Sequence, residues 1–333
     1  MKNNKKSTMA KQRMSMAEVL MTPEISMLIV LIVLCVYTNS VNQAFFAVKN
    51  IQIILRNCAF IGALAVGEAF ALMCGEIDLS IGCNATLCSL VFAHASIILG
   101  WSPIASILAG LFTGIAVGLI NAFITLKLGM TSWITTLSTQ YICKGLGTII
   151  SKGGAIASLK GGFVTMSKAR PLGLSWMLFI VIGIIFIMGM FMQFTPMGRK
   201  VHAVGISPEA SRIAGLKVTY IKGLCMVFAG GMAAVCGILQ TISSLSGSPV
   251  TGIGNEFPAI ICCAIGGVST TGGKGTMWGV FIGLLMYQTL KNCLQTLGLN
   301  GNYQMVVTGI VLLVAVAFDL VKKNFRFKRK KVA

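Results

Sequence analysis

The sequence contains few charged residues, and acidic residues are the scarcest of them. Among 333 residues only 8 are Asp or Glu, against 27 Lys or Arg, and charged residues make up 11% of the chain. Ordinary soluble domains contain about 25% charged residues. With 56% hydrophobic residues and a mean hydropathy of +0.86, this composition is not that of a soluble domain, and it predicts a polytopic membrane protein.

Residues that build metal or catalytic sites are also scarce. The chain has 2 histidines, and neither His94 nor His202 has a Cys or Asp partner at ligand spacing. No two of the 11 cysteines form a C-x-x-C pair, and most lie in apolar runs where Cys acts as a small hydrophobic residue. No nucleophile elbow or Ser-His-Asp order can be assembled. The sequence therefore predicts no catalytic residue and no metal site.

A nucleotide-binding loop is absent as well, although the fragment GGKGT suggests one. Counting back from Gly273 and Lys274 places Val268 where the first Gly of G-x-x-x-x-G-K-[ST] belongs. Gly275 stands where a Ser or Thr would coordinate magnesium. The chain is therefore not expected to hydrolyse ATP, and an ATP-driven process would need ATP and Mg bound by another subunit.

The formal charge of +19 comes from basic residues that gather in three places. They are an N-terminal arm (Lys2, Lys5, Lys6, Lys11, Arg13), a central loop (Arg199, Lys200, Arg212, Lys217, Lys222) and a C-terminal tail (Lys322, Lys323, Arg326, Lys328, Arg329, Lys330, Lys331). Basic clusters beside apolar spans indicate the cytoplasmic side. Because aromatic residues are not interleaved with them, contact with anionic membrane lipid is favoured over nucleic acid. The polar arm also predicts an uncleaved first span instead of a signal peptide.

Segments of about 20 apolar residues predict the membrane spans. Ten segments qualify, at 25–46, 51–74, 78–99, 103–126, 132–150, 174–194, 219–241, 258–270, 276–297 and 303–321, the eighth being too short to cross unaided. Six precede the central loop, so this loop and both tails fall on one side, although the loop at 151–171 is basic and falls on the other. The predicted fold is all-α, with a basic arm at 1–24, one transmembrane domain at 25–321 containing a loop at 195–219, and a basic tail at 322–333.

Two glycine-rich breaks interrupt the apolar segments. In GEIDLSIG, residues 75–82, Asp78 or Ser80 could cap the helix that follows, which leaves open whether Asp78 supports the fold or binds solute. The second break is 266–276, GGVSTTGGKGT. Breaks in both halves of the chain indicate discontinuous, re-entrant helices near 75–82 and 258–276 around a central pathway. The glycines expected to form the breaks are Gly75, Gly82, Gly266, Gly267, Gly272 and Gly273.

Carboxylates and other polar side chains inside the spans are candidates for a pathway. Glu68, Glu76, Asp78 and Glu256 lie within or beside apolar segments, where a carboxylate is costly enough to suggest a function. A sugar would need amide, hydroxyl and aromatic side chains along an apolar route. The residues predicted to line a translocation pathway are Asp78, Ser80, Asn84, Trp133, Gln140, Gln288 and Asn292, each of which could instead bond a neighbouring helix.

The central loop contains a short predicted helix. Ser207 can cap it, Pro208 suits its first position, Glu209 complements the positive end of its dipole, and Gly215 closes it. Ala210, Ile213 and Ala214 recur at spacings of three and four, so one face could dock in a partner's groove while Arg212 stays solvated. The alternative is a solvated loop with one helical turn, since so short a helix is marginal alone.

Three stretches resemble permeases of sugar-type ABC importers of the ribose, xylose and autoinducer-2 group. VHAVGISPEASRIAGL, residues 201–216, resembles their cytoplasmic coupling segment, GEIDLSIG resembles Gly-Gly-Ile-Asp-Leu-Ser-Val-Gly, and residues 254–276 resemble their Gly-Gly...Gly-Gly-x-Gly-Thr run. The similarity spans about 51–319. Departures are Glu76 for the second Gly, Ile206-Ser207 for Gly-Asn, and Ser211 for the second Ala; the first puts any inherited substrate assignment in doubt.

The resemblance implies partners as well as an activity. It implies an importer of a monosaccharide or similar small polar solute, such as a pentose, a hexose, autoinducer-2 or a nucleoside, in the cytoplasmic membrane of a bacterium, with both termini cytoplasmic. It also implies a cytoplasmic ATP-binding subunit, a periplasmic or lipid-anchored solute-binding protein, and a second permease subunit, identical or related. Ser207, Glu209, Ala210, Arg212 and Gly215 are the residues it places in the ATPase-coupling segment.

Two other functions remain open at this stage. An ion-coupled secondary transporter would use Glu68, Asp78 or Glu256 as its coupling carboxylate, and a membrane scaffold would transport nothing. Under the importer hypothesis Glu209→Arg abolishes uptake and leaves assembly intact. Uptake that survives loss of ATP and collapses with an ionophore would favour the secondary transporter.

Overall fold

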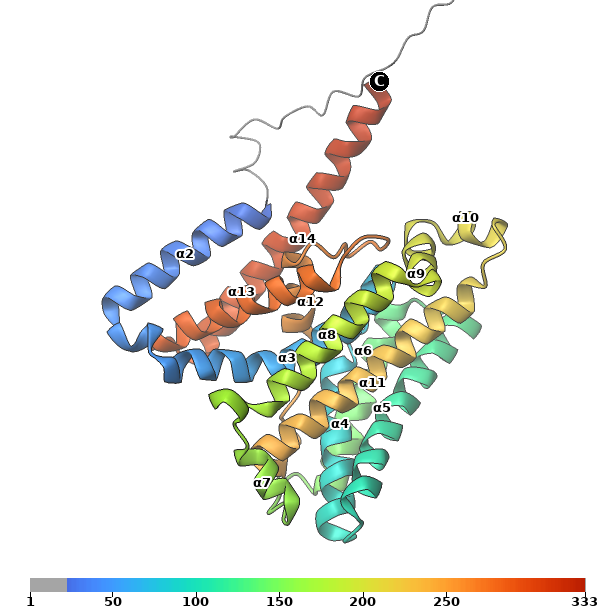
Figure 1. The fold of residues 1–333 in the computed structure, drawn as a ribbon. Helices are drawn as coiled ribbons and strands as arrows, with labels where there is room; N and C mark the ends of the chain where they lie inside the picture. The colour runs from blue at the N-terminus through green and yellow to red at the C-terminus, as the bar shows by residue number, and fades with distance from the viewer. Residues whose placement is uncertain (1–22, 333) are drawn as a thin grey trace, which may run out of the picture.

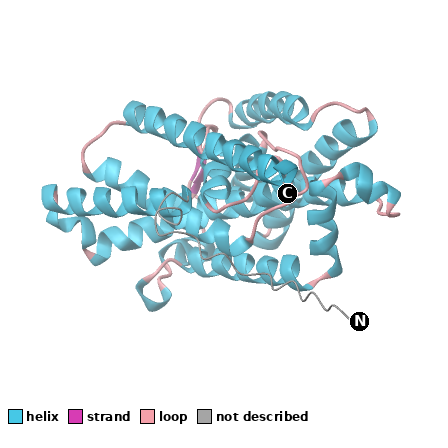
Figure 2. Ribbon diagram, turned by 90° about the horizontal axis from the view of Figure 1, so that it is seen from above, coloured by secondary structure: helices cyan, strands magenta, loops and turns pink. Residues whose placement is uncertain are grey.

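The computed structural model describes residues 23–332, and they form an almost entirely helical protein (Figures 1 and 2). The helices are α2 (Pro23–Val41), α3 (Val48–Met73), α4 (Ile81–Ala93), α5 (Pro103–Lys127), α6 (Ser132–Ser151), α7 (Gly162–Lys168), α8 (Trp176–Phe194), α9 (Pro196–Ile206), α10 (Pro208–Ile213), α11 (Val218–Ser244), α12 (Glu256–Ile265), α13 (Met277–Thr296) and α14 (Gly301–Val332). The short 3-10 helices η1 (Gln43–Phe46) and η3 (Pro171–Gly173) connect some of them, and the π-helical stretch η2 (His94–Ile98) continues α4. The all-α prediction is confirmed. Most of the predicted arm at 1–24 lies outside the described residues, as do the side chains of the predicted tail at 322–333.

Each of the ten predicted spans overlaps a different one of the helices α2 to α6, α8 and α11 to α14. Within residues 23–332, five segments are both long and apolar enough to cross a membrane: α3, α4 continued through η2, α5, α8 and α11. The eighth predicted span corresponds to α12, which has 10 residues. At 1.5 Å per residue such a helix covers about half of a hydrocarbon core roughly 30 Å thick. The expectation that this segment cannot cross alone is consistent with that length.

The core is organised around α11, which packs against α3, α4 and α5. The contact with α5 is close because glycines meet there: a methyl group on Gly114 would overlap the carbonyl oxygen of Gly230. A second close contact joins α12 and α13, where Gly266 lies against the backbone of Gly279. Lipid provides no hydrophobic drive for helix association, so close backbone packing of this kind holds membrane helices together.

The two ends of the molecule differ in which loops they carry. Figure 1 shows the start of α2, the α10 segment and the end of α14 toward the top of the view, and α7 at the bottom. This arrangement agrees with the span count, which places both tails and the central loop on one side and the loop at 151–171 on the other. That basic loop contains structure that the sequence did not indicate, because β1 (Ile156–Ala157) pairs antiparallel with β2 (Ser246–Gly247) and α7 follows it.

Candidate functional site: a junction of three polar segments

The central loop forms two helices instead of the single one expected. The first, α9, begins at Thr195, whose Oγ1 accepts a hydrogen bond from the Gly198 amide at 3.2 Å, with Pro196 in the first helical position. A Thr-Pro pair is a helix-start signal in the sequence. The sequence analysis missed α9 because Gly198 and Gly205 both disfavour helix. In the structure both glycines allow close packing against other backbone segments.

The second helix, α10, has the caps that the sequence predicts. Ser207 Oγ accepts a hydrogen bond from the Ala210 amide at 3.2 Å, and Gly215 has a φ of +80°, which a glycine adopts without strain. The predicted docking face is open: Ala210 and Ala214 are exposed, and Ile213 is 84% exposed. With six residues, Pro208–Ile213, the helix has less than two turns, so it lies between the predicted helix and the alternative of a loop with one helical turn.

The first glycine-rich break lies between α3 and α4. Gly75, with a φ of +84°, ends the turn after α3. The chain then runs without regular structure to Ser80, which is buried together with Glu76 and Asp78. Irregular backbone at membrane depth is stable only if protein groups satisfy its N–H and C=O groups.

Four consecutive amides of this break each donate to a side-chain oxygen. Ile77 donates to Ser132 Oγ at 3.3 Å, and Leu79 donates to Thr136 Oγ1 at 3.1 Å, both on α6. The Asp78 amide donates to Glu68 Oε1 at 3.3 Å, and the Ser80 amide donates to Asp78 Oδ1 at 2.9 Å. Two of the intramembrane carboxylates, Glu68 and Asp78, thus have a clear structural use.

Asp78 accepts a backbone N–H at the start of α4, as the structural alternative predicts. Ser80 does not cap that helix with its side chain. Its hydroxyl donates to Asp78 Oδ1 at 2.5 Å and accepts from Asn121 Nδ2 at 2.9 Å, which links the break to α5. Gly82 lies inside α4 and does not break the chain. A glycine is needed at this position because a side chain would overlap Gly252 and Glu256.

The second break and the central loop both contact the first break. The Gly273 amide donates to the Met73 carbonyl at 2.9 Å. Gly205, in the last turn of α9, lies so close that a methyl group on it would overlap the Met73 carbonyl oxygen and the Gly273 amide. A methyl group on Gly272 would lie 2.7 Å from the Gly205 carbonyl oxygen and 3.0 Å from the Gly75 Cα. We call this meeting of residues 73–80, 205–206 and 266–276 the junction.

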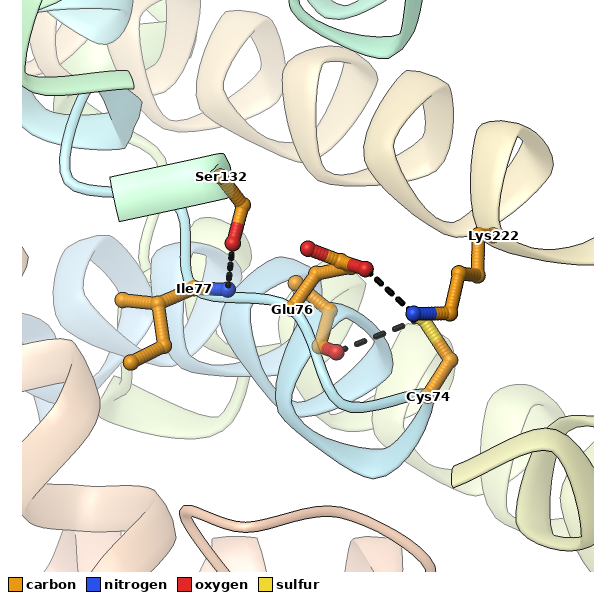
Figure 3. Close-up of polar contacts among 6 residues, drawn as sticks. Cys74, Glu76, Ile77, Ser132 and Lys222 are labelled. Carbon is orange, nitrogen blue, oxygen red and sulfur yellow. Dashed lines mark hydrogen bonds and ion pairs between the residues drawn. The ribbon is translucent and has the colours of Figure 1, made fainter. Parts of the chain in front are cut away.

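An ion pair fixes the start of α11 to the junction. Figure 3 shows the Lys222 side chain reaching from α11 to Glu76, with Nζ 2.5 Å from Oε1. The two side chains are 15% and 9% exposed. On the other side of the same loop, Ser132 accepts the Ile77 amide (Figure 3). Because Lys222 follows α10 by nine residues, α10 is connected to the first break by a short stretch of chain and by this pair.

Comparison with known proteins shows to which family this chain belongs. A family described as the permease component of the branched-chain amino acid transport system matches residues 50–316. The chain belongs to this permease family. It is 34% identical to the ribose import permease protein of Bacillus subtilis (strain 168), over 87% of this chain and 90% of the relative. It is 34% identical to the L-arabinose transport system permease protein of Escherichia coli (strain K12), over 79% and 80%.

The predicted pathway residues of the permease occupy two kinds of position. Asp78, Ser80, Asn84, Gln288 and Asn292 are buried. Asn292 and Asn50 exchange two amide hydrogen bonds at 2.8 and 2.9 Å, and Gln288 donates to the Asn57 carbonyl at 3.2 Å. Trp133 is 52% exposed, and Gln140 on the same helix donates to Glu256 Oε1 at 2.7 Å. The structure brings Asp78 and Ser80 together, and it leaves α6 at the edge of the packed helices.

Sequence reasoning missed the contacts that join the permease's three motifs. Glu76 was noted as a departure from the family pattern, but its partner Lys222 was counted only as a basic loop residue. Glu76 and Lys222 lie 146 residues apart in the sequence, and no local pattern specifies that they pair. Among the described residues no group of three or more His, Cys, Asp or Glu side chains is placed to hold a metal ion.

Adding a methyl group at the junction is expected to destabilise the permease. Gly205→Ala should lower the free energy of unfolding by about 1–3 kcal/mol, because the new Cβ meets backbone atoms that cannot rotate away. Thermal unfolding of the purified permease in detergent measures the change. Gly183→Ala on α8 is the control, since no atom lies within 4 Å of its added Cβ. Equal stability of the two variants would contradict the close packing described here.

Proposed function

We propose that this permease is the membrane-spanning subunit of an ATP-driven importer for a monosaccharide or a similar small polar solute. The relatives named for ribose and L-arabinose import support the class of solute. The observation that supports coupling to a separate motor is α10, a capped helix whose apolar face Ala210, Ile213 and Ala214 is exposed. A short exposed helix of this kind fits a groove on a partner protein.

Force applied to α10 has a direct route into the membrane part of the chain. α10 follows α9 after a single residue, Ser207, and the end of α9 lies against the junction through Gly205. The junction in turn holds the end of α3, the start of α4 and the loop before α13. Since packed helices shift as rigid bodies between discrete arrangements, displacement of α10 would tilt these helices together. ATP and Mg are bound by the partner in this scheme.

The proposed arrangement assigns the other partners to places on the molecule. The end with α10 faces the cytoplasm and binds an ATP-binding subunit, and both termini lie on that side. The end with α7 faces outward and receives solute from a periplasmic or lipid-anchored binding protein. A second permease subunit, identical or related, completes the pathway in the cytoplasmic membrane of a bacterium. The charge of the central loop supports this orientation under the positive-inside rule.

The source of energy tests the proposal. Uptake of D-ribose and L-arabinose is measured in cells that carry the permease together with an ATP-binding subunit and a solute-binding protein. Depletion of ATP should stop uptake, and an ionophore that collapses the proton and sodium gradients while ATP is maintained should leave it near its initial rate. Uptake that survives ATP depletion and stops with the ionophore would replace this proposal with an ion-coupled transporter using an intramembrane carboxylate.

A further inference from the structure

An apolar cavity lies at the end of the helix bundle that carries α7. Its volume is about 180 Å³. The wall includes His94, Leu99 and Trp101 in and after η2, Ala109 on α5 and Ile150 in the last turn of α6. Leu99 and Trp101 are 52% and 50% exposed, so the cavity opens at this edge. A dry apolar cavity of about 150 Å³ holds a benzene molecule, so a segment of a hydrocarbon chain fits in this one.

His94 gives this apolar wall a buried polar atom. Its Nδ1 is buried and has no hydrogen-bond partner in the part of the chain that the structure describes. Buried polar atoms normally have a partner, and an imidazole nitrogen can donate or accept, so a polar group of a ligand would satisfy it. His94 also begins η2, a π-helical turn, and such turns occur frequently at functional sites. The cavity therefore suits a ligand that is mostly hydrocarbon and carries a polar group.

The basic loop at 151–171 has no acidic counterpart in the chain. Its charged residues Lys152, Lys160, Lys168 and Arg170 are all exposed. No Asp or Glu occurs between residues 79 and 208. Among the side chains that the structure describes, none of these four forms an ion pair. Positive charge on the outer side of a membrane runs against the positive-inside rule, so a negatively charged partner outside the chain would account for this loop.

The start of this basic loop is held against the wall of the cavity. Lys152 follows the wall residue Ile150 by two positions, so their Cα atoms are at most about 7 Å apart. Ile156 of β1 belongs to a small buried cluster on which Ile97 and Ile150 pack. The pairing of β1 with β2 fixes this part of the loop further. Lys152 therefore lies beside the cavity, and Lys160 follows it across one short strand of the same loop.

We propose that the cavity and the adjoining lysines bind an anionic phospholipid. Part of one acyl chain occupies the cavity, an ester group meets His94, and the phosphate lies at Lys152 and Lys160. Trp101 at the opening suits the boundary between hydrocarbon and headgroups, where Trp is enriched. Lysines near a membrane surface attract anionic lipid, which a zwitterionic lipid does not match. The bound lipid connects the ends of α4, α5 and α6 and balances the charge of the basic loop. This site goes beyond the proposed transport function and needs neither ATP nor solute.

Quenching of Trp101 fluorescence by brominated lipid tests this inference. The full-length permease keeps Trp101 and carries Trp133→Phe, Trp176→Phe and Trp278→Phe. It is reconstituted in phosphatidylcholine vesicles that contain a rising fraction of brominated phosphatidylglycerol or of brominated phosphatidylcholine. The anionic lipid should reach half of its full quenching at a fraction about tenfold lower than the zwitterionic lipid, because the two lysines add attraction for its phosphate.

Lysine variants show whether the charge selects the lipid. Lys152→Asn combined with Lys160→Asn should remove the preference for phosphatidylglycerol, and asparagine tolerates the φ of +51° at position 152. Lys200→Asn combined with Lys217→Asn is the matched control, because both lysines are exposed and lie in the central loop at the other end of the molecule. The control should keep the preference. Equal quenching by the two lipids in the parent, or a preference that survives the loss of Lys152 and Lys160, overturns the proposal. In the second case, weaker binding of the solute-binding protein to that variant would assign the loop to this partner.

A cavity-filling variant tests the place of the acyl chain. Ala109→Phe puts a ring into the cavity and should reduce quenching of Trp101 by both brominated lipids. Leu108→Phe, at a neighbouring position that is 57% exposed, should leave quenching unchanged. Unchanged quenching in a folded Ala109→Phe protein overturns the proposal. Thermal unfolding in detergent shows whether this variant folds, and if it does not, the lysine variants decide the result.

Discussion

Reversing the charge at Glu209 will abolish solute uptake and leave the permease folded in the membrane. Glu209 is exposed in the first turn of α10 and has no role in the packing of the bundle. An arginine there is repelled by the positive end of the helix dipole, which destabilises the helix by about 0.3–1 kcal/mol. This cost is too small to unfold the protein. It also places a new charge beside the exposed face formed by Ala210 and Ile213. Uptake in cells and the amount of permease in the membrane are the two measurements.

Two further variants show whether the loss arises at α10. Ile213, which is 84% exposed, lies at the tip of the apolar face, and Ile213→Asp should also stop uptake. Leu128→Arg adds the same side chain as Glu209→Arg to the loop between α5 and α6, where Leu128 is 64% exposed, and uptake should continue. If Glu209→Arg and Ile213→Asp both transport at the parental rate, α10 is not the element through which the motor acts.

Removing the charge of Lys222 will destabilise the permease through Glu76. The two side chains are 15% and 9% exposed, so Lys222→Met leaves a carboxylate almost buried without its ion-pair partner. Breaking a buried pair in this way costs about 3–5 kcal/mol, most of it from the charge that remains. Thermal unfolding in detergent should show a large drop in midpoint, and uptake should fall with the amount of folded protein.

A charge swap tests whether the pair itself is responsible. The double variant Glu76→Lys with Lys222→Glu should recover much of the stability lost in Lys222→Met, because an opposite charge again faces each side chain. Lys217→Met, at the start of the same helix, is exposed and should change the free energy of unfolding by less than about 0.5 kcal/mol. A Lys222→Met protein as stable as Lys217→Met would contradict the contact seen in Figure 3.

The sequence predicted α10 well because its determinants are local. Ser207, Pro208 and Gly215 lie within nine residues of one another, and each acts on the backbone beside it. The structure reproduces the cap from Ser207 and the positive φ at Gly215. Helix α9 was missed although Thr195 and Pro196 mark its start, since the glycines inside it argue against helix until their close packing is known.

The sequence by itself determined that this is a helical membrane protein, and it indicated the short helix that follows Ser207. Hydrophobic length and capping residues act within a few turns of the chain, so they can be read without a fold. Only the tertiary structure decided that residues 73–80, 205–206 and 266–276 meet, that Glu76 pairs with Lys222, and that the cavity beside His94 adjoins the basic loop. These features join residues up to about 200 positions apart, and their partners are selected by the packing of whole helices, which no local pattern specifies.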